Sequence, residues 1–155
     1  MKVVAYSIQA FEKEFLIKAN QKKHDITLIS NALTEETAGF AAGKDAVIVF
    51  TDDNVSENII EKLASFGVRF ITTRSVATNH IDKLAAAANG LKVANVPFAS
   101  LQATHQDYPT PEALQEIAGQ TIRNLDLWQL EKCVGSACVC AKNCRVVTKD
   151  AVSKI

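Results

Sequence analysis

The sequence predicts an α/β protein built around a five-stranded parallel sheet. Three observations point to this class: short apolar runs alternate with segments of helical periodicity, the loops between them are short, and residues 46–50 are apolar at every position. A continuous apolar run suits a strand that is buried on both faces, as in a parallel sheet. The regular alternation of strand and helix favours a doubly wound arrangement with crossover connections.

The first half of the chain supplies three of the predicted strands, which are residues 2–7, 26–29 and 46–50. Between the first two strands, apolar side chains recur at helical spacing with charged residues opposite them, which predicts an amphipathic helix. These apolar positions are Phe11, Phe15, Leu16 and Ala19. Thr34 is suited to cap a short helix that reaches about Ala42.

The second half continues the alternation with two more strands. Ser56 is suited to cap the next helix, and Gly67 follows at a position where helices often end. Residues 68–72 and 91–96 predict the fourth and fifth strands, and a helix of about residues 79–89 lies between them.

A final helix over residues 111–132 completes the predicted fold by covering the last strand. Thr110 is a good N-cap, and Pro111 suits the first helical position. One apolar stripe follows this helix through Leu114, Ile117, Ala118, Thr121, Ile122, Leu125 and Trp128. Gly119 lies inside the stripe, where it is a local weakness or a point of close contact. Residues 98–109 have no clear periodicity and predict a loop that joins the two parts of the domain.

Length and composition indicate a single globular domain. The chain has 155 residues, 48% of them hydrophobic and 22% charged, and its 17 basic residues balance its 17 acidic ones. This balance argues against a nucleic-acid-binding surface, which requires a basic excess. No apolar run approaches the ~20 residues of a membrane span, and the N-terminus lacks the features of a signal peptide. We therefore expect a cytoplasmic protein.

All four cysteines lie near the C-terminus, so we divide the chain into a domain of residues 1–132 and a tail of residues 133–155. The spacing C-x4-C-x-C-x3-C is formed by Cys133, Cys138, Cys140 and Cys144. Four thiolates this close can bind zinc or an iron–sulfur cluster, although the spacing matches no common zinc knuckle or bacterial ferredoxin. Unpaired thiols on two tail strands, residues 137–140 and 144–147, are the alternative.

The main candidate for a ligand site is the loop of residues 73–82, with the sequence Thr-Arg-Ser-Val-Ala-Thr-Asn-His-Ile-Asp. In an open parallel sheet, ligands bind beyond the carboxyl ends of the strands, and this loop leads from the fourth strand into a helix. Backbone N–H groups at such a junction can hold a small anion.

This loop resembles the Arg-Ser-Val-Gly-Thr-Asp-His-Ile-Asp sequence of the D-2-hydroxyacid dehydrogenases, in particular those of the D-lactate dehydrogenase kind. The resemblance covers residues 1–97 and about 104–132. It implies a flavodoxin-like (βα)5 three-layer sandwich with strand order 2-1-3-4-5. It also implies that Val76 and Ala77 contact the substrate carboxylate, with Ala77 in place of the family's glycine, and that Ser75 belongs to the substrate-binding residues.

A second match lies near the end of the predicted domain, where Thr104-His105-Gln106 precedes the Glu-Ala-Leu sequence of residues 112–114. The resemblance places His105 at the family's general acid/base histidine and Tyr108 at an aromatic residue of the substrate pocket. In the family, this histidine exchanges a proton with the substrate oxygen while nicotinamide exchanges a hydride with its carbon. The glutamate and arginine that assist the histidine belong to the family's coenzyme domain.

The coenzyme domain that separates these two segments in the family is missing between them here, as after engineering or an internal gene deletion. The chain contains no Gly-x-Gly-x-x-Gly sequence, so NAD is expected only in the intact enzyme and His105 is expected to be vestigial. We expect a domain that binds 2-oxo acids such as pyruvate weakly at most and transfers no hydride. Family dimers form largely through the coenzyme domain, so we expect a monomer or weak non-native association.

Two other functions share the (βα)5 layout. A phosphorylation-switched receiver requires an aspartate after the third strand, where Asp52 and Asp53 lie, and a Ser or Thr after the fourth, where Thr73 lies. The acidic residues and the lysine that receivers carry after strands one and five are missing. An FMN-binding flavodoxin requires a phosphate loop after the first strand, but residues 7–10 are few and include no glycine. A metal or redox protein based on the cysteines is the remaining alternative.

Overall fold

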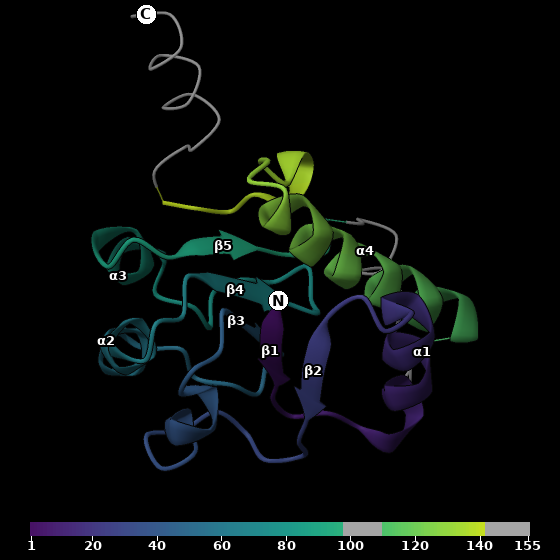
Figure 1. The fold of residues 1–155 in the computed structure, drawn as a ribbon, viewed down its shortest axis with the longest axis horizontal. Helices are drawn as coiled ribbons and strands as arrows, with labels where there is room; N and C mark the ends of the chain where they lie inside the picture. The colour runs from purple at the N-terminus through teal and green to yellow at the C-terminus, as the bar shows by residue number, and fades with distance from the viewer. Residues whose placement is uncertain (98–109, 142–155) are drawn as a thin grey trace, which may run out of the picture.

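The computed structural model describes residues 1–97 and 110–141, and Figure 1 shows a central sheet between two layers of helices. The five parallel strands are β1 (Lys2–Ala5), β2 (Asp25–Leu28), β3 (Ala46–Val49), β4 (Phe70–Thr73) and β5 (Lys92–Ala94). Their order in the sheet is β2-β1-β3-β4-β5. This order confirms the predicted doubly wound, flavodoxin-like arrangement.

Helices cover both faces of the sheet, as the sequence predicts. On one face lie α1 (Ala10–Asn20) and α4 (Pro111–Gln129), and on the other lie α2 (Glu57–Ser65) and α3 (Lys83–Ala88) (Figure 1). The structure also describes two short 3-10 helices, η1 (Ala38–Ala41) and η3 (Gly135–Ala137). The three layers of the predicted sandwich are therefore present.

Two predicted helices are shorter than the sequence patterns suggest. Thr34 does not begin an α-helix: its hydroxyl accepts a hydrogen bond from the Thr37 N–H, as an N-cap would, but only one turn and the 3-10 helix η1 follow. The helix after β4 begins beyond Asp82 rather than near residue 79, because the Asp82 carboxylate caps it by accepting from the Ala85 N–H. The loop between β4 and α3 therefore consists of residues 74–82.

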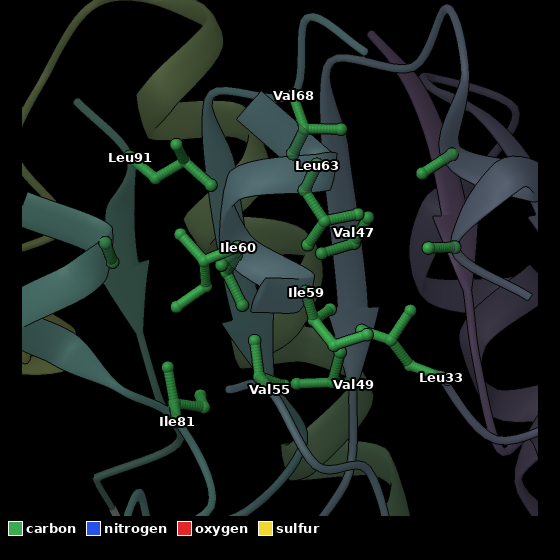
Figure 2. Packing of buried hydrophobic residues seen from close by; sticks show 14 of the residues in the cluster. Leu33, Val47, Val49, Val55, Ile59, Ile60, Leu63, Val68, Ile81 and Leu91 are labelled. Atoms are coloured by element: carbon green, nitrogen blue, oxygen red, sulfur yellow. The ribbon is translucent and has the colours of Figure 1, made fainter. Parts of the chain in front are cut away.

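One hydrophobic core lies between the sheet and the layer of α2 and α3. Figure 2 shows Ile59, Ile60 and Leu63 of α2 beside the β3 side chains of Val47 and Val49. None of these five side chains is more than 3% exposed. The apolar side predicted for this helix therefore faces the sheet.

A second hydrophobic core lies on the opposite face, under α1 and α4. The α4 side chains in it are Ala118, Ile122, Leu125 and Trp128, and the sheet contributes Val3, Ala5, Ala46, Ile48, Phe70 and Ala94. The Trp128 indole stacks on the Phe70 ring, with 4.8 Å between the ring centroids. The stripe predicted for the last helix therefore faces the sheet and contacts β4 as well as the last-strand side of this core. Each large apolar side chain buried in this way contributes about 1.5–3 kcal/mol.

The residues that follow α4 lie along the outer edge of β5. The Asn95 N–H donates to Ala137 O at 2.9 Å, and the Val139 N–H donates to Val93 O at 3.1 Å. Cys138 forms an antiparallel bridge with Ala94 of β5. Residues 137–139 therefore form part of the edge of the sheet.

Candidate anion-binding site

The loop between β4 and α3 presents an open run of backbone N–H groups at the carboxyl edge of the sheet. Within the described residues, none of the N–H groups from Ser75 to His80 donates a hydrogen bond. Ala77 and Asn79 are exposed, and the other residues of this run are partly exposed. Consecutive N–H groups that are unbonded and reachable from solvent form a favourable site for a small anion.

The carbonyl groups of this loop, in contrast, are held by other parts of the domain. Ser75 O accepts from the Val96 N–H at 3.1 Å, and Val76 O accepts from Asn95 Nδ2 at 2.9 Å. The Ser75 hydroxyl donates to Ala77 O at 2.8 Å. These bonds use the carbonyl groups of all three loop residues that the sequence predicted as substrate-binding, and they leave the N–H groups available.

His80 lies at the end of the open run and contacts β4. Its Nε2 is 3.1 Å from Thr73 Oγ1, which is in turn 2.7 Å from Ser75 Oγ. Its Nδ1 is buried and has no hydrogen-bond partner among the residues that the structure describes. Burial lowers the pKa of His80 below its ordinary value; the negative charge of Asp53 opposes this shift, and the positive charge of Lys83 adds to it. The imidazole is therefore neutral at pH 7.

The Asp53 side chain links three loops at the carboxyl edge of the sheet. Its buried carboxylate accepts from the Ser7 hydroxyl at 2.6 Å and from the N–H groups of Leu33 and Phe50, each at 2.8 Å. These partners lie in the loops that follow β1, β2 and β3. Because Asp53 is 1% exposed and already accepts three hydrogen bonds, it serves as a structural group and is not presented to a phosphodonor. Asp52 is exposed.

Arg74 links the start of the loop between β4 and α3 to the loop that follows β1. Its side chain is 2% exposed and forms an ion pair with Glu12 of α1. Its Nη1 and Nη2 donate to Tyr6 O and Ser7 O, each at 3.1 Å. The guanidinium is thus engaged with the loop after β1 and does not face the open N–H groups as an anion partner.

The loop between β1 and α1 does not suit a nucleotide phosphate. The Gln9 N–H at the start of α1 donates to the Glu12 carboxylate at 3.1 Å, as in a capping box. A carboxylate therefore lies at the helix N-terminus, where a phosphate of NAD or FMN would be held, and residues 7–10 include no glycine that allows close approach. Neither the NAD pyrophosphate nor the FMN phosphate fits at this junction.

Ser75, Val76 and Ala77 lie in the loop between β4 and α3. The other two predicted site residues, His105 and Tyr108, lie outside the described residues, together with the whole predicted loop of residues 98–109.

The remaining candidate site was the cysteine cluster. Cys133, Cys138 and Cys140 are partly buried, whereas Cys144 lies outside the described residues. Within residues 1–97 and 110–141, no three His, Cys, Asp or Glu side chains are grouped as metal ligands. The same ranges contain no helix with the length and apolar character needed to cross a membrane.

Several polar residues that shape the site were not indicated by the sequence patterns. Arg74 and Asp53 have partners 62 and 46 residues away in the chain, so no local pattern reveals their pairing. Asn124 did carry a signal, because it follows Thr121 by three residues on the apolar side of the last helix. An amide at such a position indicates a buried polar partner, and Asn124 is indeed fully buried.

Comparison with known proteins gives a consistent result. A family model described as D-isomer specific 2-hydroxyacid dehydrogenase, catalytic domain, matches residues 3–138. D-lactate dehydrogenase of Escherichia coli K12 is 36% identical over 98 residues, which are 63% of this chain and 30% of that enzyme. D-lactate dehydrogenase kk1H of Curvularia clavata is 36% identical over 131 residues, which are 81% of this chain and 35% of that protein. The chain therefore spans about a third of the length of these curated relatives.

Solved structures share the same fold. The apo-structure of D-lactate dehydrogenase from Escherichia coli has a TM-score of 0.62 and 35% identity, over 63% of this chain and 31% of that one. The NAD-complexed D-isomer specific 2-hydroxyacid dehydrogenase from Lactobacillus delbrueckii ssp. bulgaricus has a TM-score of 0.60 and 28% identity, over 66% of this chain and 32% of that one. With a family match that runs from β1 to the residues beyond α4, the chain belongs to the D-isomer-specific 2-hydroxyacid dehydrogenases and matches their catalytic domain.

Proposed function

We propose that this domain binds small 2-oxo acids, such as pyruvate, through the loop of residues 75–80. The observation that carries the proposal is the run of N–H groups in that loop that donate to no acceptor among residues 1–97 and 110–141. A 2-oxo acid presents a carboxylate, which accepts charge-assisted hydrogen bonds from several backbone N–H groups at once. The names of the relatives support this class of ligand, since they include D-lactate dehydrogenases and an aromatic 2-oxoacid reductase of Clostridium sporogenes.

The affinity for pyruvate is expected to be low. One cation that contacts the loop is Lys83, whose Nζ donates to Thr78 O at 3.2 Å and to Thr78 Oγ1 at 2.9 Å. Lys83 thus adds positive charge near the loop while its donors remain engaged with the protein. With backbone N–H groups as the main contacts to a very small ligand, we expect a dissociation constant of roughly 1 mM.

We further propose that the domain catalyses no hydride transfer by itself. The Glu12 carboxylate lies where a coenzyme phosphate would be held after β1, and the 155 residues contain no Gly-x-Gly-x-x-Gly sequence. His105, which the family resemblance places as the general acid/base, then has no hydride donor to work with. The test is the absorbance of NADH in the presence of pyruvate and the pure chain. Turnover above the protein-free rate would contradict the proposal.

Calorimetric titration with pyruvate tests the binding site when two variants at one position are compared. Ala77 is exposed, so neither Ala77→Glu nor Ala77→Gln disturbs the core. The carboxylate introduced by Ala77→Glu should repel the ligand and weaken binding by roughly tenfold or more, whereas Ala77→Gln should stay within roughly threefold of the wild type. No binding to the wild-type chain, or equal affinities of the two variants, would refute the proposed site.

We also propose that the chain is a monomer or associates only weakly. Among the described residues, the exposed large apolar side chains are spread over several elements: Phe11 and Ile17 on α1, Phe40 on η1, Leu84 on α3 and Leu130 after α4. Single exposed apolar residues of this kind are normal for a monomer, whereas a stable dimer requires a contiguous patch. Sedimentation at increasing concentration tests this expectation, and a tight, well-defined dimer would be incompatible with it.

A further inference from the structure

We propose that Asn124 of α4 is a positioning residue for the open loop between β4 and α3, and that it acts through Asn95. The inference rests on the proposed function for its consequence in binding, but its structural part is tested separately. Asn124 is fully buried on the face of α4 that packs on the sheet. A helix that only covered the sheet would carry an apolar side chain at this position, because burial of an amide is costly unless its polar atoms are paired.

The side chain of Asn124 is hydrogen-bonded at both of its polar atoms. Its Nδ2 lies 3.1 Å from Asn95 O and 3.2 Å from Thr72 Oγ1, so the donors reach the end of β5 and the neighbouring strand β4. Its Oδ1 accepts from Gln120 Nε2 of the same helix at 2.8 Å. Gln120 therefore orients the amide of Asn124, and Asn124 fixes the backbone of Asn95.

Asn95 carries this connection to the open loop. It follows β5 directly, is 6% exposed, and donates from Nδ2 to Val76 O at 2.9 Å. The next residue, Val96, donates its N–H to Ser75 O at 3.1 Å. Residues 95 and 96 thus hold two successive carbonyl groups of the loop, and the bond from Asn124 to Asn95 O fixes where these two residues lie.

The position of the loop N–H groups therefore depends on a side chain of α4. When Ser75 O and Val76 O are held against residues 95 and 96, the N–H groups of Val76 and Ala77 remain available to a carboxylate. Binding of a small ligand requires its contacts to be placed within a fraction of an ångström, so a loosened loop binds less tightly. The geometry thus assigns α4 two roles: it closes one core, and it supports the ligand loop.

Amide hydrogen exchange and pyruvate titration of the 155-residue chain test this role. Asn124→Leu removes the donors to Asn95 and Thr72 with little change in volume. Relative to the amides of β1, the Val96 N–H should exchange roughly tenfold faster, and pyruvate should bind roughly tenfold more weakly. The relative rate matters because a change in overall stability would alter the exchange of β1 as well.

Thr121→Val is the matched control. Thr121 is also fully buried on α4, but its hydroxyl donates to Ile117 O within the same helix. This variant should leave both the relative exchange of the Val96 N–H and the pyruvate affinity within roughly twofold of the wild type. The hydrogen bond that it loses, from Thr121 to Ile117 O, also comes from a buried side chain but does not lead to Asn95 or the loop.

Gln120→Ala provides a second variant that keeps the test valid if Asn124→Leu does not fold. Gln120 is only partly buried, and its loss leaves Asn124 present but less well oriented, so both effects should be roughly threefold. Unchanged relative exchange of the Val96 N–H in the variants that fold would overturn the role of Asn124. Faster exchange together with no pyruvate binding by the wild-type chain would support the positioning role and refute the proposed function.

Discussion

The imidazole Nε2 of His24 lies 2.7 Å from the Oδ1 atom of Asp126, and this contact joins the segment after α1 to α4 across 102 residues of sequence. The His24 side chain is fully buried, and its Nδ1 lies 3.2 Å from the amino terminus of Met1. Lys23 Nζ contacts the other carboxylate oxygen of Asp126 at 2.8 Å. Asp126 thus connects the two helices that cover one face of the sheet.

Asp126→Asn should remove a stabilising contribution that depends on pH. Partial burial raises the pKa of Asp126, but the hydrogen bonds from Lys23 and His24 outweigh this effect and hold the pKa below its ordinary value of 3.8. A carboxylate with a lowered pKa stabilises the fold above its unfolded pKa, and the contribution is lost as the pH falls through the folded value. Because Asp126 is about one-third exposed, we expect Asp126→Asn to lower the free energy of unfolding by only about 1 kcal/mol at pH 7.

Urea unfolding between pH 7 and pH 3 measures this difference. The gap between the wild type and Asp126→Asn should shrink as the pH falls below 3.8. Glu116→Gln, which neutralises an exposed carboxylate on the same helix, should show no comparable gap. A difference that persists unchanged at pH 3 would show that the charge of Asp126 is not the cause.

Leu125→Ala should strongly destabilise the domain. Leu125 is fully buried in the core under α1 and α4, and truncation of such a side chain leaves a cavity that costs about 2–5 kcal/mol. Leu130→Ala is a suitable control because Leu130 is 64% exposed, so its effect should be within about 0.5 kcal/mol. Equal effects of the two substitutions in denaturant unfolding would mean that α4 does not close this core.

Gly119→Ala should stabilise the domain. Gly119 is in the interior of α4, is exposed, and has space for a Cβ atom: among the described residues, no atom beyond its chain neighbours and the surrounding helix backbone would lie within 4 Å of that Cβ. Of the two roles predicted from the sequence, the structure therefore favours the local weakness over the close contact. Glycine inside a helix costs roughly 0.5–1 kcal/mol relative to alanine, and thermal unfolding should show a gain of this size. A lower melting temperature would indicate a contact that the described residues do not provide.

The pKa of His80 should lie below its ordinary value of 6.5, because burial disfavours the charged imidazole and, together with repulsion from Lys83, outweighs the attraction of Asp53. Folded molecules then bind fewer protons than unfolded ones, so the free energy of unfolding should rise with pH between the lowered pKa and about 6.5. Lys83→Met should raise the pKa of His80 in an NMR titration, whereas Lys62→Met on α2 should leave it unchanged. A pKa of His80 that falls in Lys83→Met would contradict this assignment of the cause.

The strands were predictable from the sequence because their signals are local. The apolar run of β3 is buried at all four positions, Ala46–Val49, as expected for a strand between two helical layers. The signal for the start of α4 was also local, since the Thr110 hydroxyl accepts a hydrogen bond from the Ala113 N–H. The helix predicted after Thr34 was wrong because a polar side chain that suits an N-cap also closes single turns in loops, and the start predicted near residue 79 was wrong because Asp82 caps α3 three residues later.

The candidate site was predictable in place but not in detail. Topology alone puts the loop of Ser75, Val76 and Ala77 at the carboxyl edge of the sheet. Tertiary contacts orient that loop, because Asn95 and Asn124 meet only after β5 and α4 have packed. No local pattern encodes such a pairing, although the amide on the apolar side of α4 marked the position where one was needed.

The most direct test of the account is a two-dimensional amide NMR spectrum of the full chain, recorded with increasing pyruvate. We expect the dispersed signals of a single folded domain, and shifts concentrated on the N–H groups of residues 75–80 with smaller changes at Asn95 and Val96. A spectrum that does not change with pyruvate, or shifts concentrated elsewhere on the domain, would contradict it.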